Sequence, residues 1–235
     1  MNRGSLYLIP NVIAEGTAES VIPSSVREAL KPIRFFLVED VRTARRYLST
    51  LKIYDRIDDL VFDVLNKDTA PVALDTLMKP LMDGQHMGVI SESGCPGVAD
   101  PGALAVAWAH RMNIRVVPLT GPSSLLMALM ASGLNGQRFA FHGYLPIDKT
   151  EAAQTLKALV RESRQRQQTQ IFIETPYRNN AVFAILLNEL PAEAKLTVAL
   201  DLTGKQESIV THTIAEWKSR KQDWPKLPAV FLFLA

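Results

Sequence analysis

The feature that most constrains the fold of this 235-residue chain is the stretch Ser91-Glu-Ser-Gly-Cys-Pro-Gly-Val-Ala-Asp-Pro-Gly102, which is rich in glycine and proline. A strand-like run, 86–90, precedes it, and an apolar helical run, 103–112, follows it. Glycine lets the backbone approach a ligand closely and proline fixes φ, so such a loop presents main-chain groups in one rigid shape. In an open α/β sheet, small molecules bind outside the carboxyl ends of the strands. The stretch therefore predicts a ligand-binding loop, with an ordinary structural turn as the alternative.

A second loop of the same kind follows one strand later. Residues 114–119 predict a strand, Thr120-Gly-Pro-Ser-Ser124 a loop, and residues 125–132 a helix that ends at Gly133. Ser123 and Ser124 would lie at the helix N-terminus, where free N–H groups favour an anion or a carboxylate. Serine there is also a common N-cap with no other role. We expect the two loops to form two walls of one pocket.

Apolar runs predict further elements on both sides of a domain boundary near Leu119, giving domains at 1–118 and 119–235. The run 34–38 has four apolar residues in a row, as expected for a strand buried on both faces of a parallel sheet. The other predicted strands are 4–9, 138–144, 170–174, 196–200 and 228–234, and the other predicted helices are 23–30, one beginning near Glu39, 72–83, 151–168, 179–190 and 213–217. Residues 52–68 give no clear pattern.

Composition excludes several classes of protein. The single cysteine, Cys95, rules out an internal disulfide framework and favours a reducing cytoplasm, where we expect the protein. The four histidines show no metal-ligand spacing, and there is no phosphate-loop or dinucleotide-binding motif. No apolar run approaches the ~18 residues that span a bilayer, and the N-terminus lacks the pattern of a signal peptide. The net charge of +2 neither indicates nor excludes nucleic acid as a partner.

Short motifs occur along the chain in a fixed order: Gly88-Val-Ile-Ser-Glu-Ser-Gly-Cys-Pro96, Asp100-Pro-Gly102, Val116-Val-Pro118, Gly121-Pro-Ser123 and Ala131-Ser-Gly-Leu134. In this order they resemble the tetrapyrrole-methylase-like, S-adenosylmethionine-dependent methyltransferases. The resemblance is closest to the bacterial branch that methylates a cytidine ribose 2′-hydroxyl in small-subunit ribosomal RNA. Gln170-Ile-Phe-Ile-Glu-Thr-Pro-Tyr-Arg178 and Asp201-Leu-Thr-Gly-Lys205 resemble later motifs of that branch. The first loop, from Pro10 to Gly16, departs from its Thr-Pro-Ile-Gly-Asn, and the stretch near Asn66 lacks its His-Glu pair.

The resemblance implies a two-domain α/β fold with a mostly parallel sheet in the N-terminal domain, a mixed sheet in the C-terminal domain and a cofactor cleft between them. It implies S-adenosylmethionine as the cofactor, S-adenosylhomocysteine as the product, no metal, and a homodimer without a membrane segment. The residues implied to contact the cofactor are Ile9, Gly94, Cys95, Pro96, Val98, Ser123, Ser124, Ile173, Leu202 and Ala229.

The catalytic base is not identified by the sequence. Glu39, Asp40 and Glu174 are the main candidates, with Asp100 and Asp201 as further carboxylates, and each could instead be an N-cap or a loop acceptor. The predicted substrate-binding residues are Arg42, Arg45, Arg178 and Lys205, which could meet RNA phosphates or simply form a solvated surface. Nothing in the sequence activates Cys95 as a nucleophile.

Three functions therefore stay open. The first is methylation of ribosomal RNA, with the RNA or the small ribosomal subunit as partner. The second is methylation of a tetrapyrrole or another small acceptor, which would need an enclosed apolar trough instead of an open basic surface. The third is a non-catalytic paralogue that binds the cofactor without turnover.

Overall fold

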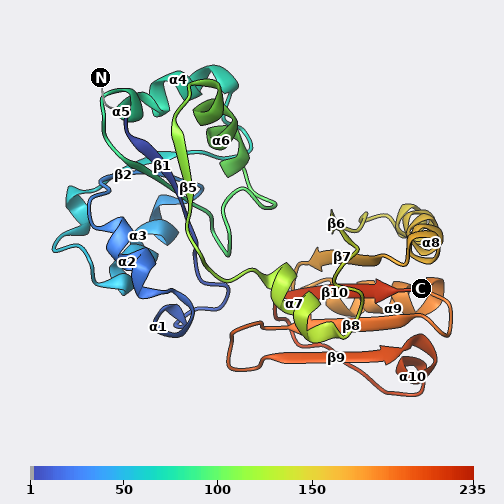
Figure 1. Ribbon diagram of the computed structural model, residues 1–235. Coiled ribbons are helices and arrows are strands. Elements are labelled where there is room, and N and C mark those ends of the chain that lie inside the picture. The colour runs from blue at the N-terminus through green and yellow to red at the C-terminus, as the bar shows by residue number, and fades with distance from the viewer. Residues whose placement is uncertain (1–2) are drawn as a thin grey trace. The chain divides into compact units, whose positions relative to one another are not determined.

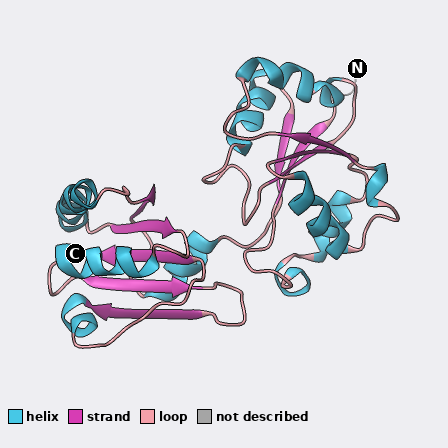
Figure 2. Cartoon of the chain, turned by 180° about the vertical axis from the view of Figure 1, so that it is seen from behind, coloured by secondary structure: helices cyan, strands magenta, loops and turns pink. Residues whose placement is uncertain are grey.

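The computed structural model describes residues 3–235, which form two compact units (Figures 1 and 2). The N-terminal unit ends at Ser123, and the C-terminal unit runs from Ser124 to Ala235. Each unit is built on one five-stranded sheet.

The sheet of the N-terminal unit is parallel, with strand order β3-β2-β4-β1-β5. Its strands are β1 (Ser5–Ile9), β2 (Phe35–Val38), β3 (Val61–Val64), β4 (Met87–Ile90) and β5 (Arg115–Pro118). Its helices are α1 (Ala18–Val21), α2 (Ser24–Leu30), α3 (Val41–Leu51), α4 (Leu74–Leu77), α5 (Lys79–Met82) and α6 (Gly102–Arg111), with short 3₁₀ turns at Ile57–Asp59 and Pro71–Ala73.

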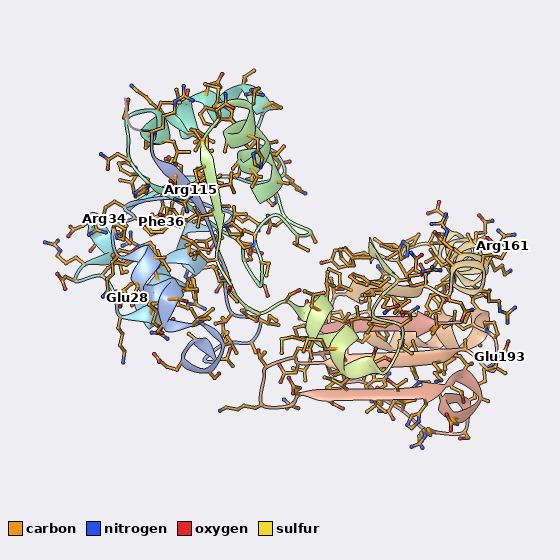
Figure 3. All side chains as sticks on the ribbon, in the orientation of Figure 1. Glu28, Arg34, Phe36, Arg115, Arg161 and Glu193 are labelled. Carbon is orange, nitrogen blue, oxygen red and sulfur yellow. The ribbon has the colours of Figure 1, made fainter. Side chains whose placement is uncertain are left out.

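Helices cover both faces of this sheet, which explains the continuous apolar run of β2. Phe36 and Val38 belong to the buried cluster formed with α2 and α3, whereas Leu37 between them belongs to the cluster formed with α4, α5 and α6. Successive side chains of a strand point to opposite faces, so each face needs its own apolar residues. Figure 3 shows Phe36 inside the unit, while Glu28 and Arg34 lie at its surface.

The sheet of the C-terminal unit is mixed, with strand order β6-β7-β10-β8-β9. The β6–β7 pair is parallel and the other pairs are antiparallel. The strands are β6 (Phe139–Tyr144), β7 (Thr169–Glu174), β8 (Lys195–Leu200), β9 (Ser208–Thr213) and β10 (Ala229–Leu234), and the helices are α7 (Ser124–Ser132), α8 (Lys149–Arg166), α9 (Asn179–Glu189) and α10 (Ile214–Lys218).

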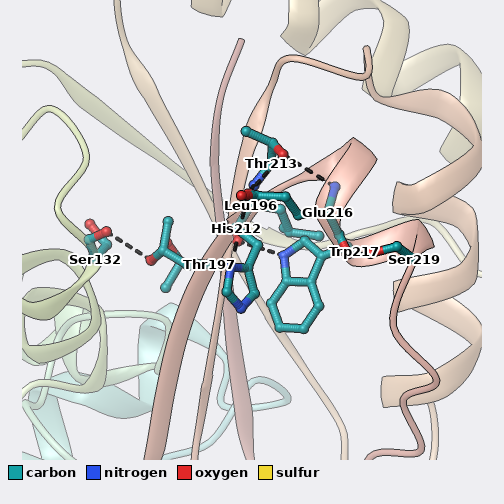
Figure 4. A network of polar contacts seen from close by, with 9 residues as sticks. Ser132, Leu196, Thr197, His212, Thr213, Glu216, Trp217 and Ser219 are labelled. Carbon is teal, nitrogen blue, oxygen red and sulfur yellow. Dashed lines mark hydrogen bonds and ion pairs between the residues drawn. The ribbon is translucent and has the colours of Figure 1, made fainter.

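The two faces of this mixed sheet are covered differently. Phe172, Phe231 and Trp217 belong to the large buried cluster that α8, α9 and α10 share with the sheet. Helix α7 contacts β9 and β10, where the Thr211 hydroxyl lies 2.7 Å from that of Thr197 and donates to the Ser132 carbonyl at 2.8 Å (Figure 4). Thr197 alternates with the residues of the large cluster, so α7 lies on the opposite face of the sheet.

The expected combination of a parallel and a mixed sheet is confirmed. The single helix expected over 72–83 is wrong, because the segment forms a 3₁₀ turn followed by α4 and α5, with a break at Met78. Pro80 has no backbone N–H and cannot continue an α-helical ladder from α4. Two edge strands, β3 and β9, were not predicted. Their side chains are only partly buried, so neither strand carries a strong apolar alternation.

Candidate functional site

In the N-terminal unit, the connections that follow the adjacent strands β1 and β4 run to opposite faces of the sheet. The two strands are neighbours, yet the chain leaving β1 leads to α2 on one face, and the chain leaving β4 leads to α6 on the other. Where connections of adjacent parallel strands diverge in this way, open α/β sheets bind ligands. The Gly/Pro-rich loop 91–101 begins at this point.

Asn11 fastens that loop to the end of β1. Its backbone N–H donates to the Gly94 carbonyl at 2.8 Å, and its side-chain amide donates to the carbonyls of Ser91 at 2.9 Å and Glu92 at 3.0 Å. Its side-chain oxygen accepts from the Val12 N–H at 2.8 Å. Asn11 itself is 2% exposed; the bond to Ser91 is buried, and those to Glu92 and Val12 are partly buried. Sequence reasoning missed this role, for which the only signal was a polar residue directly after a buried strand and a proline.

Asp100 shapes the far half of the loop from within. Its carboxylate accepts from the Gly97 N–H at 2.8 Å and from the Gly102 N–H at 2.6 Å. Gly94 and Gly97 have φ of +68° and +83°, and the nearby Ala99 also has a positive φ of +61°. Burial raises the pKa of the Asp100 carboxyl, and the two N–H donors oppose this shift. The Asp100 carboxylate therefore stabilises the conformation of the loop.

The two Gly/Pro loops contact each other. The Cys95 thiol donates to the Pro122 carbonyl at 3.4 Å, and a Cβ on Gly121 would lie only 2.0 Å from the Cβ of Pro10. Burial, followed by the nearby Asp100 carboxylate, raises the pKa of the Cys95 thiol. A thiol held in its neutral form is a hydrogen-bond donor and a poor nucleophile.

The other predicted cofactor contacts of this unit lie along the same edge. Ile9 is fully buried at the end of β1, Gly94 and Pro96 are buried within the loop, and Val98 is 50% exposed. Ser123 is the last residue of this unit, and Ser124, the first residue of α7, begins the C-terminal unit.

Glu39 lies beside the same loop, at the end of β2. Together with residues of α3 and the start of the loop it borders a shallow surface depression, which is lined by Glu39, Asp40, Thr43, Ala44, Ile90, Ser91 and Glu92. Its carboxylate has one long contact, 3.4 Å from the Glu92 N–H. Partial burial raises the pKa of Glu39, the Glu92 N–H lowers it, and the negative charges of Asp100 and Glu92 raise it further.

Asp40, by contrast, is the N-cap of α3. Its side chain accepts from the Thr43 N–H at 2.7 Å, and this bond lowers the pKa of Asp40. The arginines of α3 differ in their surroundings. Arg45 forms an ion pair with Asp58 and Arg46 one with Glu15, whereas Arg42 is exposed.

The residues predicted for the cofactor in the C-terminal unit come together at one end of its sheet. Ala229 pairs with Glu174 and Leu200, and Val230 pairs with Ile173. The Asp201 N–H donates to the Pro228 carbonyl at 3.0 Å, which places Leu202 just beyond the same edge. Strand pairing therefore assembles Ile173, Leu202 and Ala229 from three separate segments.

At that edge the buried Glu174 forms an ion pair with Arg178, whose side chain is partly exposed. The guanidinium Nη1 of Arg178 lies 3.3 Å from Oε2 of Glu174, whose side chain is 1% exposed. Arg178 Nη2 also donates to the Pro146 carbonyl at 3.1 Å, and Thr175 donates to the other carboxylate oxygen. Both charged groups are thus occupied in holding loops together.

The turn after β8 is held by its own acidic side chains. Asp201 accepts from the Gln206 N–H at 2.8 Å, and Glu207 accepts from the Thr203 N–H at 2.7 Å. Lys205 lies exposed at the tip. The Thr203 hydroxyl is buried and has no hydrogen-bond partner within residues 3–235. A buried hydroxyl without a partner is energetically costly.

Within the described part of the chain, no three His, Cys, Asp or Glu side chains are grouped so that they could hold a metal ion. None of the helices over residues 3–235 has both the length and the apolar character needed to cross a membrane.

Comparison with known proteins gives close sequence relatives. The chain is 32% identical over 211 residues to the Synechocystis protein named "Ribosomal RNA small subunit methyltransferase I", covering 90% of this chain and 71% of the relative. It is 30% identical over 224 residues to the Bacillus subtilis protein of the same name, covering 94% and 72%. No protein-family model matches the chain.

Solved structures share the fold. The methyltransferase CobJ superposes with a TM-score of 0.61 at 17% identity, covering 98% of this chain and 94% of CobJ. Uroporphyrin-III C-methyltransferase from Thermus thermophilus, complexed with S-adenyl homocysteine, gives a TM-score of 0.57 at 16% identity, covering 98% and 97%. At such low identity these likenesses establish the two-sheet α/β fold alone.

Proposed function

This chain belongs to the ribosomal RNA small subunit methyltransferase I family, and on that premise we propose that it methylates ribosomal RNA of the small subunit with S-adenosylmethionine. The proposed acceptor is the ribose 2′-hydroxyl of a cytidine. The observation that carries the proposal is the Gly/Pro loop, which Asn11 and Asp100 fix at the point where the connections from β1 and β4 diverge.

The residues along the two sheet edges fit this cofactor. In the N-terminal unit the loop from Gly94 to Val98, together with Ser123, offers main-chain groups and small side chains. In the C-terminal unit Ser124 offers a hydroxyl, and Ile173, Leu202 and Ala229 offer apolar side chains. When bound, the cofactor supplies a methyl group on a sulfonium, so the protein needs chiefly to orient the acceptor hydroxyl and remove its proton.

Glu39 is the proposed base. Asp40 is engaged as a helix cap with a lowered pKa, and Glu174 is buried against Arg178. Glu39 keeps a carboxylate with a single long hydrogen bond, in an exposed position beside a shallow surface depression. Its raised pKa makes the carboxylate a stronger proton acceptor, as general base catalysis requires.

Arg42 and Lys205 are the proposed contacts to RNA phosphates. Both are exposed, whereas Arg45 is paired with Asp58 and Arg178 with Glu174. We propose that the two paired arginines, Arg45 and Arg178, hold the surrounding loops in place. The proposal includes a cytoplasmic homodimer, and exposed apolar side chains on α7, Leu126 and Met130, support a subunit interface.

The test is transfer of labelled methyl from S-adenosylmethionine to small ribosomal subunits that lack their native modifications, with a tetrapyrrole as a parallel acceptor. We expect label on the subunit RNA and its loss in the Glu39→Gln variant. Label on the tetrapyrrole alone would replace the proposed acceptor. Cofactor binding without label on either acceptor would indicate a non-catalytic relative.

A further inference from the structure

An exposed aromatic–cation pair lies in the C-terminal unit, outside the residues assigned above to the cofactor. Tyr177 is 81% exposed, and the Lys226 ammonium lies 5.2 Å from the centroid of its ring. The two residues are far apart in sequence. Tyr177 follows β7 and Lys226 precedes β10, so antiparallel pairing of these strands brings them to the same end of the sheet.

The turn that carries Tyr177 is firmly held. Glu174 accepts from the Thr175 N–H at 2.7 Å, and the Arg178 N–H donates to the Thr175 carbonyl at 2.9 Å. The Arg178 side chain, paired with buried Glu174, also donates to the Pro146 carbonyl. The backbone on either side of Tyr177 is thus fixed, while its ring projects into solvent.

The segment that carries Lys226 is held by the first turn of α9. The Asn179 amide donates to the Leu227 carbonyl at 2.8 Å and to the Pro225 carbonyl at 3.3 Å. Lys226 lies between these two anchored residues. Both members of the pair are therefore placed by partly buried polar contacts of their neighbours, although their own side chains are exposed.

We propose that Tyr177 and Lys226 form a binding site for an unpaired nucleotide of the RNA substrate, in which the base stacks on the phenol ring and the ammonium pairs with an adjacent phosphate. The inference rests on the proposed function and adds a subsite to it. Single-stranded nucleic acid offers exposed base faces that stack on aromatic side chains, and cations beside them neutralise the backbone. A base within a duplex cannot offer its face in this way.

The position of the pair suits a nucleotide close to the target. Tyr177 follows Ile173 and Glu174, and Lys226 precedes Ala229, so the pair borders the edge of the sheet proposed to meet the cofactor. A stacked base at this edge would limit the freedom of the neighbouring nucleotides. Orientation of an acceptor hydroxyl depends on such positioning.

The test measures binding and turnover separately. Anisotropy of a fluorescein-labelled single-stranded oligoribonucleotide gives RNA affinity, methyl transfer to unmodified small subunits gives KM and kcat, and calorimetry gives cofactor affinity. The variants are Tyr177→Ala, Tyr177→Phe and Lys226→Ala. Lys221→Ala is the matched control, because Lys221 is an exposed lysine shortly before Lys226 in the chain.

We expect Tyr177→Ala to weaken RNA binding and raise KM for subunits by roughly 5–150-fold, the range for loss of one stacked base, with cofactor affinity unchanged. Tyr177→Phe should retain affinity because the ring face remains. Lys226→Ala should weaken binding and reduce the slope of log K against log salt by about 0.7, as for one lost phosphate contact. Lys221→Ala should match the unaltered protein, and melting temperatures should not change.

Several outcomes would overturn the inference: unaltered RNA affinity and KM in Tyr177→Ala, equal losses in the alanine and phenylalanine variants, a loss confined to cofactor affinity, or no RNA binding by the unaltered protein. If RNA binding depends on Tyr177 but the protein transfers no methyl group to any subunit, the proposed function is refuted while the RNA-binding site stands.

Discussion

Replacing Asn11 by alanine should release the Gly/Pro loop from the end of β1. The substitution removes three side-chain hydrogen bonds, two donated to the carbonyls of Ser91 and Glu92 and one accepted from the Val12 N–H. A net contribution of about 0.5–1.5 kcal/mol for each bond gives a loss of roughly 1.5–4.5 kcal/mol. For a chain of this size, about 3 kcal/mol corresponds to a fall in Tm of roughly 6–12 °C.

Asn11→Asp provides the sharper comparison because it keeps the size of the side chain. The carboxylate can still accept from the Val12 N–H, but an oxygen replaces the nitrogen that faces two carbonyl oxygens. Oxygen against oxygen in a buried position is repulsive. At neutral pH we therefore expect Asn11→Asp to lose at least as much stability as Asn11→Ala. At low pH the protonated carboxyl can donate one bond, and the difference from the unaltered protein should shrink.

Thermal unfolding followed by circular dichroism, at neutral and acidic pH, measures both losses. Calorimetry with S-adenosylmethionine then reports whether the loop's position matters for the cofactor, and we expect weaker binding in both variants at a temperature where they remain folded. An Asn11→Asp protein as stable as the unaltered one would refute the hydrogen-bond argument. Full cofactor affinity in a destabilised but folded Asn11→Ala protein would refute the link between Asn11 and the ligand.

Three further substitutions test other parts of the site. Glu39 has a pKa above its usual value of 4.5, so the fold loses stability as pH rises from 4.5 through that raised pKa and the carboxyl ionises. Glu39→Gln should therefore raise Tm at pH 7, lose this gain as pH falls through the raised pKa to 4.5, and reduce methyl transfer by about 10²–10⁴-fold. Gly121→Ala would place a Cβ 2.0 Å from that of Pro10; it should cost about 1–3 kcal/mol in urea unfolding and weaken cofactor binding. Arg178→Met leaves the Glu174 carboxylate buried without its counter-charge; the loss of about 3–5 kcal/mol should be partly recovered by adding Glu174→Gln.

Sequence reasoning located the loops at strand ends because local chemistry determines them. The glycines of the 91–102 stretch and Gly133 adopt positive φ or allow close approaches, and Pro10 and Pro118 lie at the ends of β1 and β5. Apolar runs located the central strands, since each face of the parallel sheet must be buried. These signals depend on neighbouring residues alone.

What escaped prediction depends on contacts between distant residues. Asn11 acts on Ser91 and Glu92, about eighty positions away, and nothing near Asn11 in the sequence encodes that distance. Strand β9 is stabilised by pairing with β8 along its whole length, so its own residues need little apolar character. The same holds for the hydrogen bond from Arg178 to the Pro146 carbonyl, 32 positions earlier in the chain.

In the Gly94–Pro96 segment, the backbone conformation and the Cys95 side chain have separate roles. Its thiol donates to the Pro122 carbonyl and so ties the loop after β4 to the loop after β5. A threonine hydroxyl at this position could donate in the same way. An ionised aspartate could not, because a carboxylate only accepts hydrogen bonds. The side chain at position 95 therefore serves the contact between the two loops, while the main chain from Gly94 to Pro96 keeps the conformation proposed to meet the cofactor.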